Sequence, residues 1–316
     1  MANTNKFIAV SVFIVSLLFA CKADKNNAKK LESEAVSQTD SRIIEIVTRS
    51  MEFQMVDTLK SGWNTFLYKN LSNETHFFLL EKLPDGVRLD NYKKELIPPF
   101  ENAFNHFLVG NFEAGSKELE RIPKWFFEVQ LYGGVGLLSP KTTAQSTIYL
   151  DPGYYAMECY IRMPNGKPHA LMGMLKELVV LDENSKTNEP SPDLEVFIST
   201  ADGISFNDTL TPGTKIIKVN FTDQKTYETL LGHDVNLVRL ENLHLVDSLN
   251  NWINPADLNQ FRSPSPQGIE FLGGVNDLQA GQHGYFTVNV SSGTYAFVSE
   301  VPNALQKNML KVFEVK

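Results

Sequence analysis

Residues 131–159, LYGGVGLLSPKTTAQSTIYLDPGYYAMEC, set the expected fold, because their pattern returns at residues 271–299 as FLGGVNDLQAGQHGYFTVNVSSGTYAFVS. Both stretches contain a glycine pair, a turn ending in glycine and a Tyr-Ala pair, all displaced by 140 residues. Two shorter matches flank them in the same order: THFFLLEKL (75–83) resembles GHDVNLVRL (232–240), and MGMLKELVV (172–180) resembles KNMLKVFEV (307–315). An ordered series of matches indicates an internal repeat, so we expect two homologous domains.

The repeated unit has the alternation of β-strands. TAQSTIYL (143–150) and YYAMECYI (154–161) alternate on either side of the DPG turn, and side chains two apart in a strand lie on one face. Residues 88–128, interrupted by Pro98-Pro99, have a helical pattern with a shorter counterpart in 244–268. The sequence therefore predicts an all-β fold of two tandem antiparallel β-sandwiches, each with a helical insertion.

The expected domain boundaries follow changes in composition. Domain 1 is predicted at residues 43–182 and domain 2 at 193–316. Residues 183–192, within the polar stretch DENSKTNEPSP, have the composition of a linker between compact units.

The N-terminal residues have the pattern of an export signal. A mainly apolar run from Phe7 to Phe19 follows Lys6; it is too short to span a bilayer and typical of a secretory signal peptide. Leu18-Phe19-Ala20-Cys21 resembles a bacterial lipobox, and the next residues, KAD, resemble the surface-targeting signals of Bacteroidetes lipoproteins. We therefore expect a signal peptide at 1–20, lipidation of Cys21, a flexible tether at 21–42, and anchoring to the outer membrane on its periplasmic or surface side.

The charge and cysteine content narrow the function further. The net charge of −8, without any basic run, argues against a nucleic-acid partner. With Cys21 lipidated, Cys159 is the remaining thiol. An unpaired cysteine in an oxidising compartment is buried, joined to another chain or bound to a metal.

The residues around Cys159 suggest that this cysteine binds a metal. His76 follows the Asn-containing stretch NLSNET, Cys159 ends a predicted strand, and His169-Ala-Leu-Met-Gly-Met174 leads into the last strand of the unit. This order resembles the cupredoxins, the plastocyanin- and azurin-like Greek-key sandwiches. The resemblance in fold applies to both units and implies two tandem cupredoxin-like domains. The resemblance in metal ligands applies only to the first unit.

The resemblance implies one mononuclear copper ion in domain 1, held by His76, Cys159, His169 and Met174, with Met172 as the alternative axial ligand. Thiolate and thioether sulfur with imidazole is a donor set suited to copper. The implied role is electron transfer or copper handling rather than enzymatic catalysis. Apolar residues around His169 (Pro168, Ala170 and Leu171) would form the docking surface for a redox partner.

One feature departs from the family pattern. Nine residues separate Cys159 from His169, whereas blue-copper loops usually have two to four residues there. The spacer contains Pro-Asn-Gly, a turn-forming sequence that can fold the excess away.

A metal-free alternative uses the same residues structurally. Cys159 would be a small buried hydrophobe, Met172 and Met174 would be core residues, and the alignment of His76 with His233 would reflect a role in the fold. The protein would then be a binding or adhesion module at the cell surface, with a protein partner. Domain 2 has Ser299 at the cysteine position, so we expect no copper there in either case.

Overall fold

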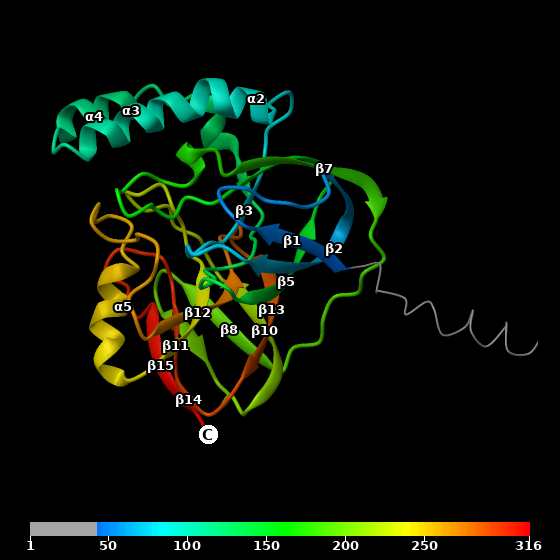
Figure 1. Cartoon of the computed structure of the whole chain (residues 1–316). Helices are drawn as coiled ribbons and strands as arrows, with labels where there is room; N and C mark the ends of the chain where they lie inside the picture. Colours follow the sequence, from blue (N-terminus) through cyan, green and yellow to red (C-terminus); the bar gives the residue numbers. More distant parts are fainter. Residues whose placement is uncertain (1–42) are drawn as a thin grey trace, which may run out of the picture. The chain divides into compact units, whose positions relative to one another are not determined.

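The chain folds mainly as β-strands over residues 43–316, the part that the computed structural model describes (Figure 1). The predicted signal peptide, the lipidation site Cys21 and the tether lie outside the described residues. The strands are β1 (Ile43–Thr48), β2 (Thr58–Asn70), β3 (Leu79–Lys82), β4 (Gln130–Leu131), β5 (Thr143–Leu150), β6 (Gly153–Glu158), β7 (Leu175–Asn184), β8 (Leu194–Ser199), β9 (Gly203–Phe206), β10 (Gly213–Phe221), β11 (Val235–Leu240), β12 (Ile269–Val275), β13 (His283–Val290), β14 (Gly293–Val298) and β15 (Leu310–Val315).

The described strands form two hydrogen-bonded sheets. An 11-stranded sheet has the order β4-β3-β6-β7-β2-β5-β13-β10-β8-β9, with β1 beside β2, and a 4-stranded sheet has the order β12-β11-β14-β15. The long strand β2 belongs to two parts of the larger sheet, since residues 58–61 pair with β7 and residues 62–69 pair with β5. Gly62, with φ of +94°, lies where the pairing changes. Glycine adopts this conformation without strain, which lets β2 leave one layer and enter the next.

The layers pack as sandwiches through aromatic side chains. In the first half, the ring of Phe66 on β2 lies 5.5 Å from that of Phe78, just before β3. In the second half, Phe206 on β9 lies 5.2 Å from Phe297 on β14. Phe66, Phe78 and Phe297 are fully buried, so these contacts belong to the hydrophobic core between facing strands.

Strand direction differs from the sequence expectation. The pairs β1–β2, β8–β10 and β2–β7 are parallel, whereas the sequence predicted antiparallel sheets. The alternation of side chains is the same in parallel and antiparallel strands. The sequence pattern therefore predicts where the strands lie, but not whether neighbouring strands run parallel or antiparallel.

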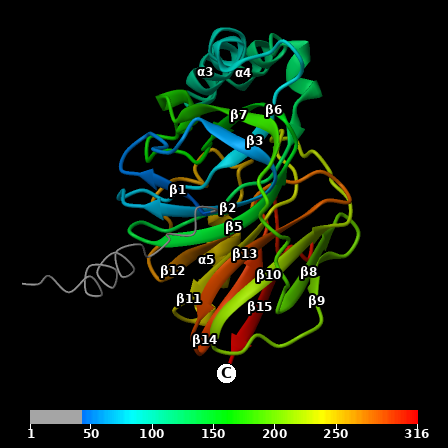
Figure 2. The same ribbon diagram turned by 90° about the vertical axis from the view of Figure 1, so that its right-hand side faces the viewer.

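The two halves contain corresponding sets of paired strands. The antiparallel run β3-β6-β7 corresponds to β11-β14-β15, and the run β1-β2-β5 corresponds to β8-β10-β13. These halves share one sheet, because β5 pairs with β13 through Thr147–Tyr285, Ser146–Phe286 and Gln145–Thr287 (Figure 2). The domain boundaries drawn from the sequence remain a prediction.

Helices form a small part of the described chain. They are α2 (Leu89–Asn91), the π-helical turn η1 (Tyr92–Leu96), α3 (Ile97–Phe107), α4 (Phe112–Leu119), the 3-10 helices η2 (Lys124–Glu128), η3 (Ala170–Met172) and η4 (Leu243–Leu245), and α5 (Val246–Trp252). Apart from η3, they lie in the two predicted insertions. Pro98 and Pro99 lie in the first turn of α3, directly after the π-helical turn η1, and proline has no N–H to donate to the preceding turn. No helix within residues 43–316 has the length and hydrophobicity needed to cross a membrane.

The larger insertion covers one end of the β-structure. In both views α3 and α4 lie above β3 and β7 (Figures 1 and 2). The cluster of sequence-predicted ligands, His76, Cys159 and His169, lies in the first half.

Candidate metal centre

His76 is positioned by a hydrogen-bonded loop. The buried side chain of Asn70, at the end of β2, donates to the backbone carbonyls of Glu74, Leu138 and Ser139 at 2.8, 3.1 and 3.2 Å. The backbone of His76 then pairs with Leu138, with N–O distances of 3.1 and 2.7 Å. An amide that satisfies several buried carbonyls fixes the loop around it, so the Asn-containing turn noted in the sequence holds the backbone of His76.

Cys159 directly follows strand β6 and is completely buried. The last residue of β6, Glu158, pairs with Leu79 on β3 and with Leu175 on β7. The next residue beyond the second pair is Met174, which therefore comes to the same end of the ladder as Cys159. The strand register therefore places the backbones of Cys159 and Met174 side by side.

His169 returns to this end through a compact turn. Met163 donates to the carbonyl of Lys167 at 2.7 Å, and Gly166 donates to Met163 at 2.8 Å. The backbone N–H of His169 then donates to the carbonyl of Ile161 at 2.8 Å. The Pro-Asn-Gly turn thus absorbs most of the nine-residue spacer, and His169 lies beside the residues that immediately follow Cys159, as the sequence hypothesis required.

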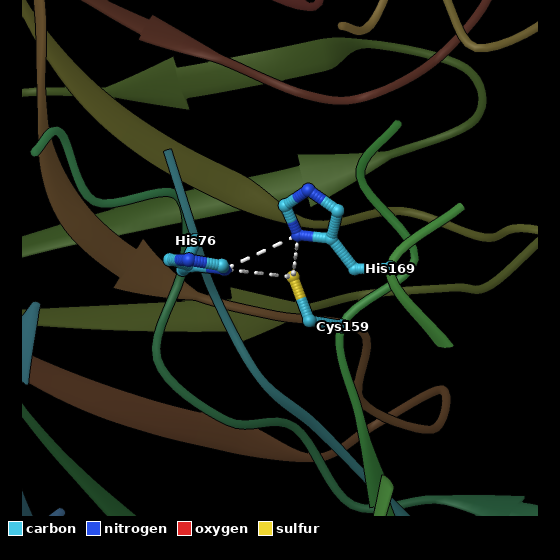
Figure 3. Close-up of side chains that lie close together, drawn as sticks. All are labelled: His76, Cys159 and His169. Carbon is cyan, nitrogen blue, oxygen red and sulfur yellow. Dashed lines mark hydrogen bonds between the residues drawn. The ribbon is translucent and has the colours of Figure 1, made fainter. Parts of the chain in front are cut away.

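The three side chains converge on one point (Figure 3). Cys159 Sγ lies 3.8 Å from His76 Nδ1 and 3.7 Å from His169 Nδ1, and the two nitrogens are 3.2 Å apart. Within residues 43–316, this is the one group of three such side chains whose donor atoms lie within 4.8 Å of one another. All three residues are fully buried.

These distances fit a trigonal metal site. A point about 2.0 Å from both nitrogens, in the plane of the three atoms, lies about 1.2 Å from the midpoint between the nitrogens. The sulfur lies about 3.4 Å from that midpoint, which leaves about 2.2 Å between the point and the sulfur. Imidazole and thiolate ligands bind metals at about 2.0–2.1 and 2.3 Å. The donor set of two imidazoles and a thiolate also fits copper chemically.

Burial controls the protonation of the metal-free cluster. Desolvation lowers the pKa of His76 to about 4; desolvation and the neighbouring His76 lower the pKa of His169 to about 3. Desolvation raises the pKa of the Cys159 thiol, although backbone N–H groups of Phe77 and Ile161 act in the opposite direction. The imidazoles are therefore neutral at neutral pH, ready to act as ligands, while the thiol must lose its proton.

The two candidate axial methionines differ in exposure. Met174 is fully buried in the core, and its backbone N–H donates to the carbonyl of His169 at 3.1 Å. The side chain of Met172 is on the exposed turn, with an exposed fraction of 47%. The geometry therefore favours Met174 over Met172 as the fourth side chain of the cluster.

The corresponding position in the second half has a different hydrogen-bond pattern. Ser299 Oγ donates to Asp234 Oδ1 at 2.9 Å. The hydroxyl of Tyr227 lies 3.2 Å from His233 Nε2 and donates to Met309 Sδ at 3.9 Å. His233 and Met309 thus come together around a tyrosine, whereas the serine is bonded to a carboxylate.

The expected docking surface around His169 is not exposed. Pro168 and Ala170 are buried and Leu171 is half-buried, and all three line a partly open cavity. The expectation that these residues form an apolar patch on the surface is therefore wrong. The helical insertion, whose packing a single sequence does not specify, covers this side of the loop.

Sequence reasoning also missed a set of buried carboxyl groups near the cluster. Glu81, Glu158, Asp277, Asp234 and Glu300 are buried, and desolvation raises the pKa of each of them. The available signal was a carboxylate inside an apolar strand, as in FFLLEKL and YYAMECYI. Such a residue is rarely buried without a specific role or partner.

Comparisons with known proteins give distant structural matches. No protein-family model matches the chain, and no curated protein matches it. Auracyanin B is 23% identical, over 41% of this chain and 93% of its own, with a TM-score of 0.29. Auracyanin A from Chloroflexus aurantiacus, described as a "blue" copper protein, is 17% identical over 44% of this chain and 98% of its own, with a TM-score of 0.26.

A larger copper protein gives a longer but weaker match. The copper-containing nitrite reductase from Thermus scotoductus is 12% identical, over 87% of this chain and 61% of its own, with a TM-score of 0.22. Similarity at this level does not determine function. The chemistry of the centre therefore follows from its own residues.

Proposed function

We propose that the chain binds one mononuclear copper ion through His76 Nδ1, Cys159 Sγ and His169 Nδ1, with Met174 as a weak axial ligand. The main support for this proposal is the buried triangle of two nitrogens and one sulfur, with sides of 3.2, 3.7 and 3.8 Å. Copper in such a site supplies one-electron redox chemistry. Electron transfer is the proposed role, with copper handling as its variant.

Four features of the chain support this role. The core around Cys159 excludes water, and the loops that carry His76 and His169 are fixed by backbone hydrogen bonds. A fixed site needs little rearrangement when its charge changes. The Phe77 and Ile161 N–H groups that favour the charged sulfur would also tune the potential. The three donors are inaccessible to a substrate, which supports electron transfer through the protein rather than catalysis at the ion.

Titration of the purified, reduced chain with Cu(II) tests the proposal. We expect one equivalent to bind and to give an intense thiolate-to-copper charge-transfer absorption. A colourless protein that binds no copper would instead support the metal-free binding or adhesion module.

The axial assignment predicts different results for the two methionines. Met174→Leu should retain copper but shift its reduction potential by about 60 mV or more, the equivalent of a tenfold change in relative affinity for the two oxidation states. Met172→Leu, on an exposed side chain, is the matched control and should leave the potential unchanged. Voltammetry of both variants measures the difference, and equal shifts would refute the assignment.

The pKa shifts predict how copper affinity depends on pH. Between about pH 5 and 8 the histidines are already neutral, because their pKa values are lowered to about 4 and about 3. The Cys159 thiol, with its raised pKa, is still protonated. Binding therefore releases one proton, and the apparent affinity should rise about tenfold per pH unit. Competition with a chelator of known pH dependence measures this slope; a pH-independent affinity would exclude thiolate ligation.

We also propose that the protein is exported and anchored by a lipid on Cys21, facing a redox or surface protein partner in the cell envelope. The lipobox-like Leu-Phe-Ala-Cys sequence supports this placement. In the native host, Cys21→Ser should abolish lipid labelling and release the processed chain from the membrane fraction. Unchanged labelling and fractionation would refute the anchor while leaving the copper proposal intact.

A further inference from the structure

A cavity of about 440 Å³ lies between the helical insertion and the β-structure. Its lining residues come from η1, α3, α4, η2, β3, β4, β6 and η3, from segments within 160–168, 226–231 and 255–261, and from Val129 and Asp277. This volume is within the range of sites for small molecules, roughly 300–1,000 Å³. Helix α3 contributes four lining residues and α4 contributes Leu119, and both helices lie above β3 (Figure 1).

The walls of the cavity are largely aromatic. Phe100, Phe104, Phe107, Phe126 and Phe127 line it, and the rings of Phe100 and Phe126 meet edge to face at 5.9 Å. Aromatic walls favour an apolar body, and the faces of the rings also attract cations.

Four carboxyl groups line the same cavity: those of Glu81, Glu158 and Asp277, which are buried, and that of Glu228, which is exposed. Glu158 accepts a hydrogen bond from the hydroxyl of Tyr92 at 2.8 Å, and Asp277 accepts one from the backbone of Gly232 at 3.0 Å. Glu81 is only 4% exposed, yet its Oε2 atom has no hydrogen-bond partner. A buried carboxyl oxygen without a partner is costly. In the lining, this oxygen and the hydroxyl of Thr229 are buried atoms without a hydrogen-bond partner, and the oxygen of Glu81 is the one that belongs to a carboxyl group.

No side chain of the lining supplies the missing donor. Among the lining residues of the described chain, Arg162 is the one cation. Its guanidinium donates instead to the backbone carbonyls of Asp257, Gln260 and Pro255, at 2.7, 3.1 and 2.5 Å. The carboxyl groups also do not gather as metal ligands, because His76, Cys159 and His169 form the one such group found within residues 43–316.

We propose that the cavity binds a small organic cation, a primary amine with an aryl or similarly apolar body, whose ammonium group donates to Glu81. The ammonium would satisfy the free carboxyl oxygen as a charge-assisted hydrogen bond, and the phenylalanine side chains would cover the apolar body. The binding site goes beyond the proposed copper centre and does not depend on it. Pro168, Ala170 and Leu171 line the cavity on either side of His169, so a bound amine would lie beside the loop that carries this ligand.

Calorimetric titration of the metal-free chain with three probes tests the proposal. The probes are 2-phenylethylamine, its neutral analogue 2-phenylethanol and the anion 3-phenylpropionate. We expect the amine to bind about tenfold or more tightly than the alcohol, as a charged hydrogen bond in a buried site would require, and the anion not to bind. Absence of amine binding at millimolar concentrations, or equal binding of the amine and the alcohol, would overturn the proposal.

Two variants test whether the ammonium group of the amine binds to the carboxyl group of Glu81. Glu81→Gln keeps the side-chain size but removes the group that can ionise beside the ammonium, and should weaken amine binding about tenfold or more while leaving the alcohol unaffected. Glu314→Gln, at an exposed carboxylate on β15, is the control and should bind the amine like the parent chain. If thermal melting shows that Glu81→Gln does not fold, Phe104→Leu, which shortens an aromatic wall, should weaken the amine and the alcohol together. Amine affinity unchanged in every folded cavity variant would refute the assigned site.

Discussion

Cys159→Ser should abolish the thiolate-to-copper absorption and lower copper affinity by at least about 100-fold. Loss of a residue that merely supports a ligand costs about 10–100-fold in affinity, and Cys159 would itself supply the one thiolate of the centre. The natural Ser299 in the second half indicates what a hydroxyl does at this position, since it donates to the carboxylate of Asp234. A serine at position 159 would find no such carboxylate, because the group of His76, Cys159 and His169 contains no Asp or Glu.

The substitution needs a control for folding, because it places a hydroxyl in a fully buried site. An unsatisfied buried hydroxyl costs about 1–3 kcal/mol in the free energy of unfolding. Cys159→Ala removes the ligand without adding a polar group and should lose the absorption while melting near the parent temperature. Absorption of undiminished intensity in both variants would show that the sulfur does not bind copper.

Gly134→Ala should destabilise the fold by about 3 kcal/mol or more, at the upper end of the usual cost of overpacking. A Cβ atom at this glycine would lie 1.9 Å from the carbonyl oxygen of Phe78, and neither backbone segment can yield easily. Phe78 donates to the carbonyl of Val135 at 3.2 Å, and Leu80 donates to that of Gly133 at 2.7 Å. The displacement would move the segment that carries His76, so copper affinity should also fall. Denaturant unfolding and copper titration of the same preparation measure both effects.

The repeat supplies a second test and a control. Gly274 occupies the corresponding place in the second half, where a Cβ would lie 2.0 Å from the carbonyl oxygen of Val235. Gly274→Ala should destabilise the protein similarly. Gly281 also has a positive φ of +79°, but a Cβ there would meet no atom within 4 Å, so Gly281→Ala should cost only about 1–2 kcal/mol, from backbone strain. Equal costs at Gly134 and Gly281 would contradict the argument from close approach.

The glycine pairs also show why the fold was largely predictable from the sequence. Close contact between backbones permits no side chain at Gly134 or Gly274, so the same requirement left the same residues in both halves. Alternation then identified the strands that flank them. Strand direction and the shared sheet were not predictable in this way, because β5 and β13 are joined by hydrogen bonds between backbones, which any residue except proline can make.

The grouping of the candidate ligands was also predictable in part. Residue type indicated His76, Cys159 and His169, and the Pro-Asn-Gly turn indicated how the long spacer could close. Burial of Met174 and exposure of Met172 depend on a single turn, η3, and periodicity cannot distinguish two methionines two residues apart. The cavity was not predictable, since it requires α3 and Glu81 to face each other across a packing that no local pattern specifies.

The pairing of β5 with β13 has a consequence for how the chain is made. During synthesis the first half emerges with the outer edge of β5 unpaired, and this edge stays open until residues 283–290 arrive. An open strand edge is a template for pairing with another chain, and contacts between distant residues form slowly. The nascent protein is therefore most exposed to intermolecular association while residues 151–282 are still being added, although all three proposed copper ligands have already emerged by residue 169.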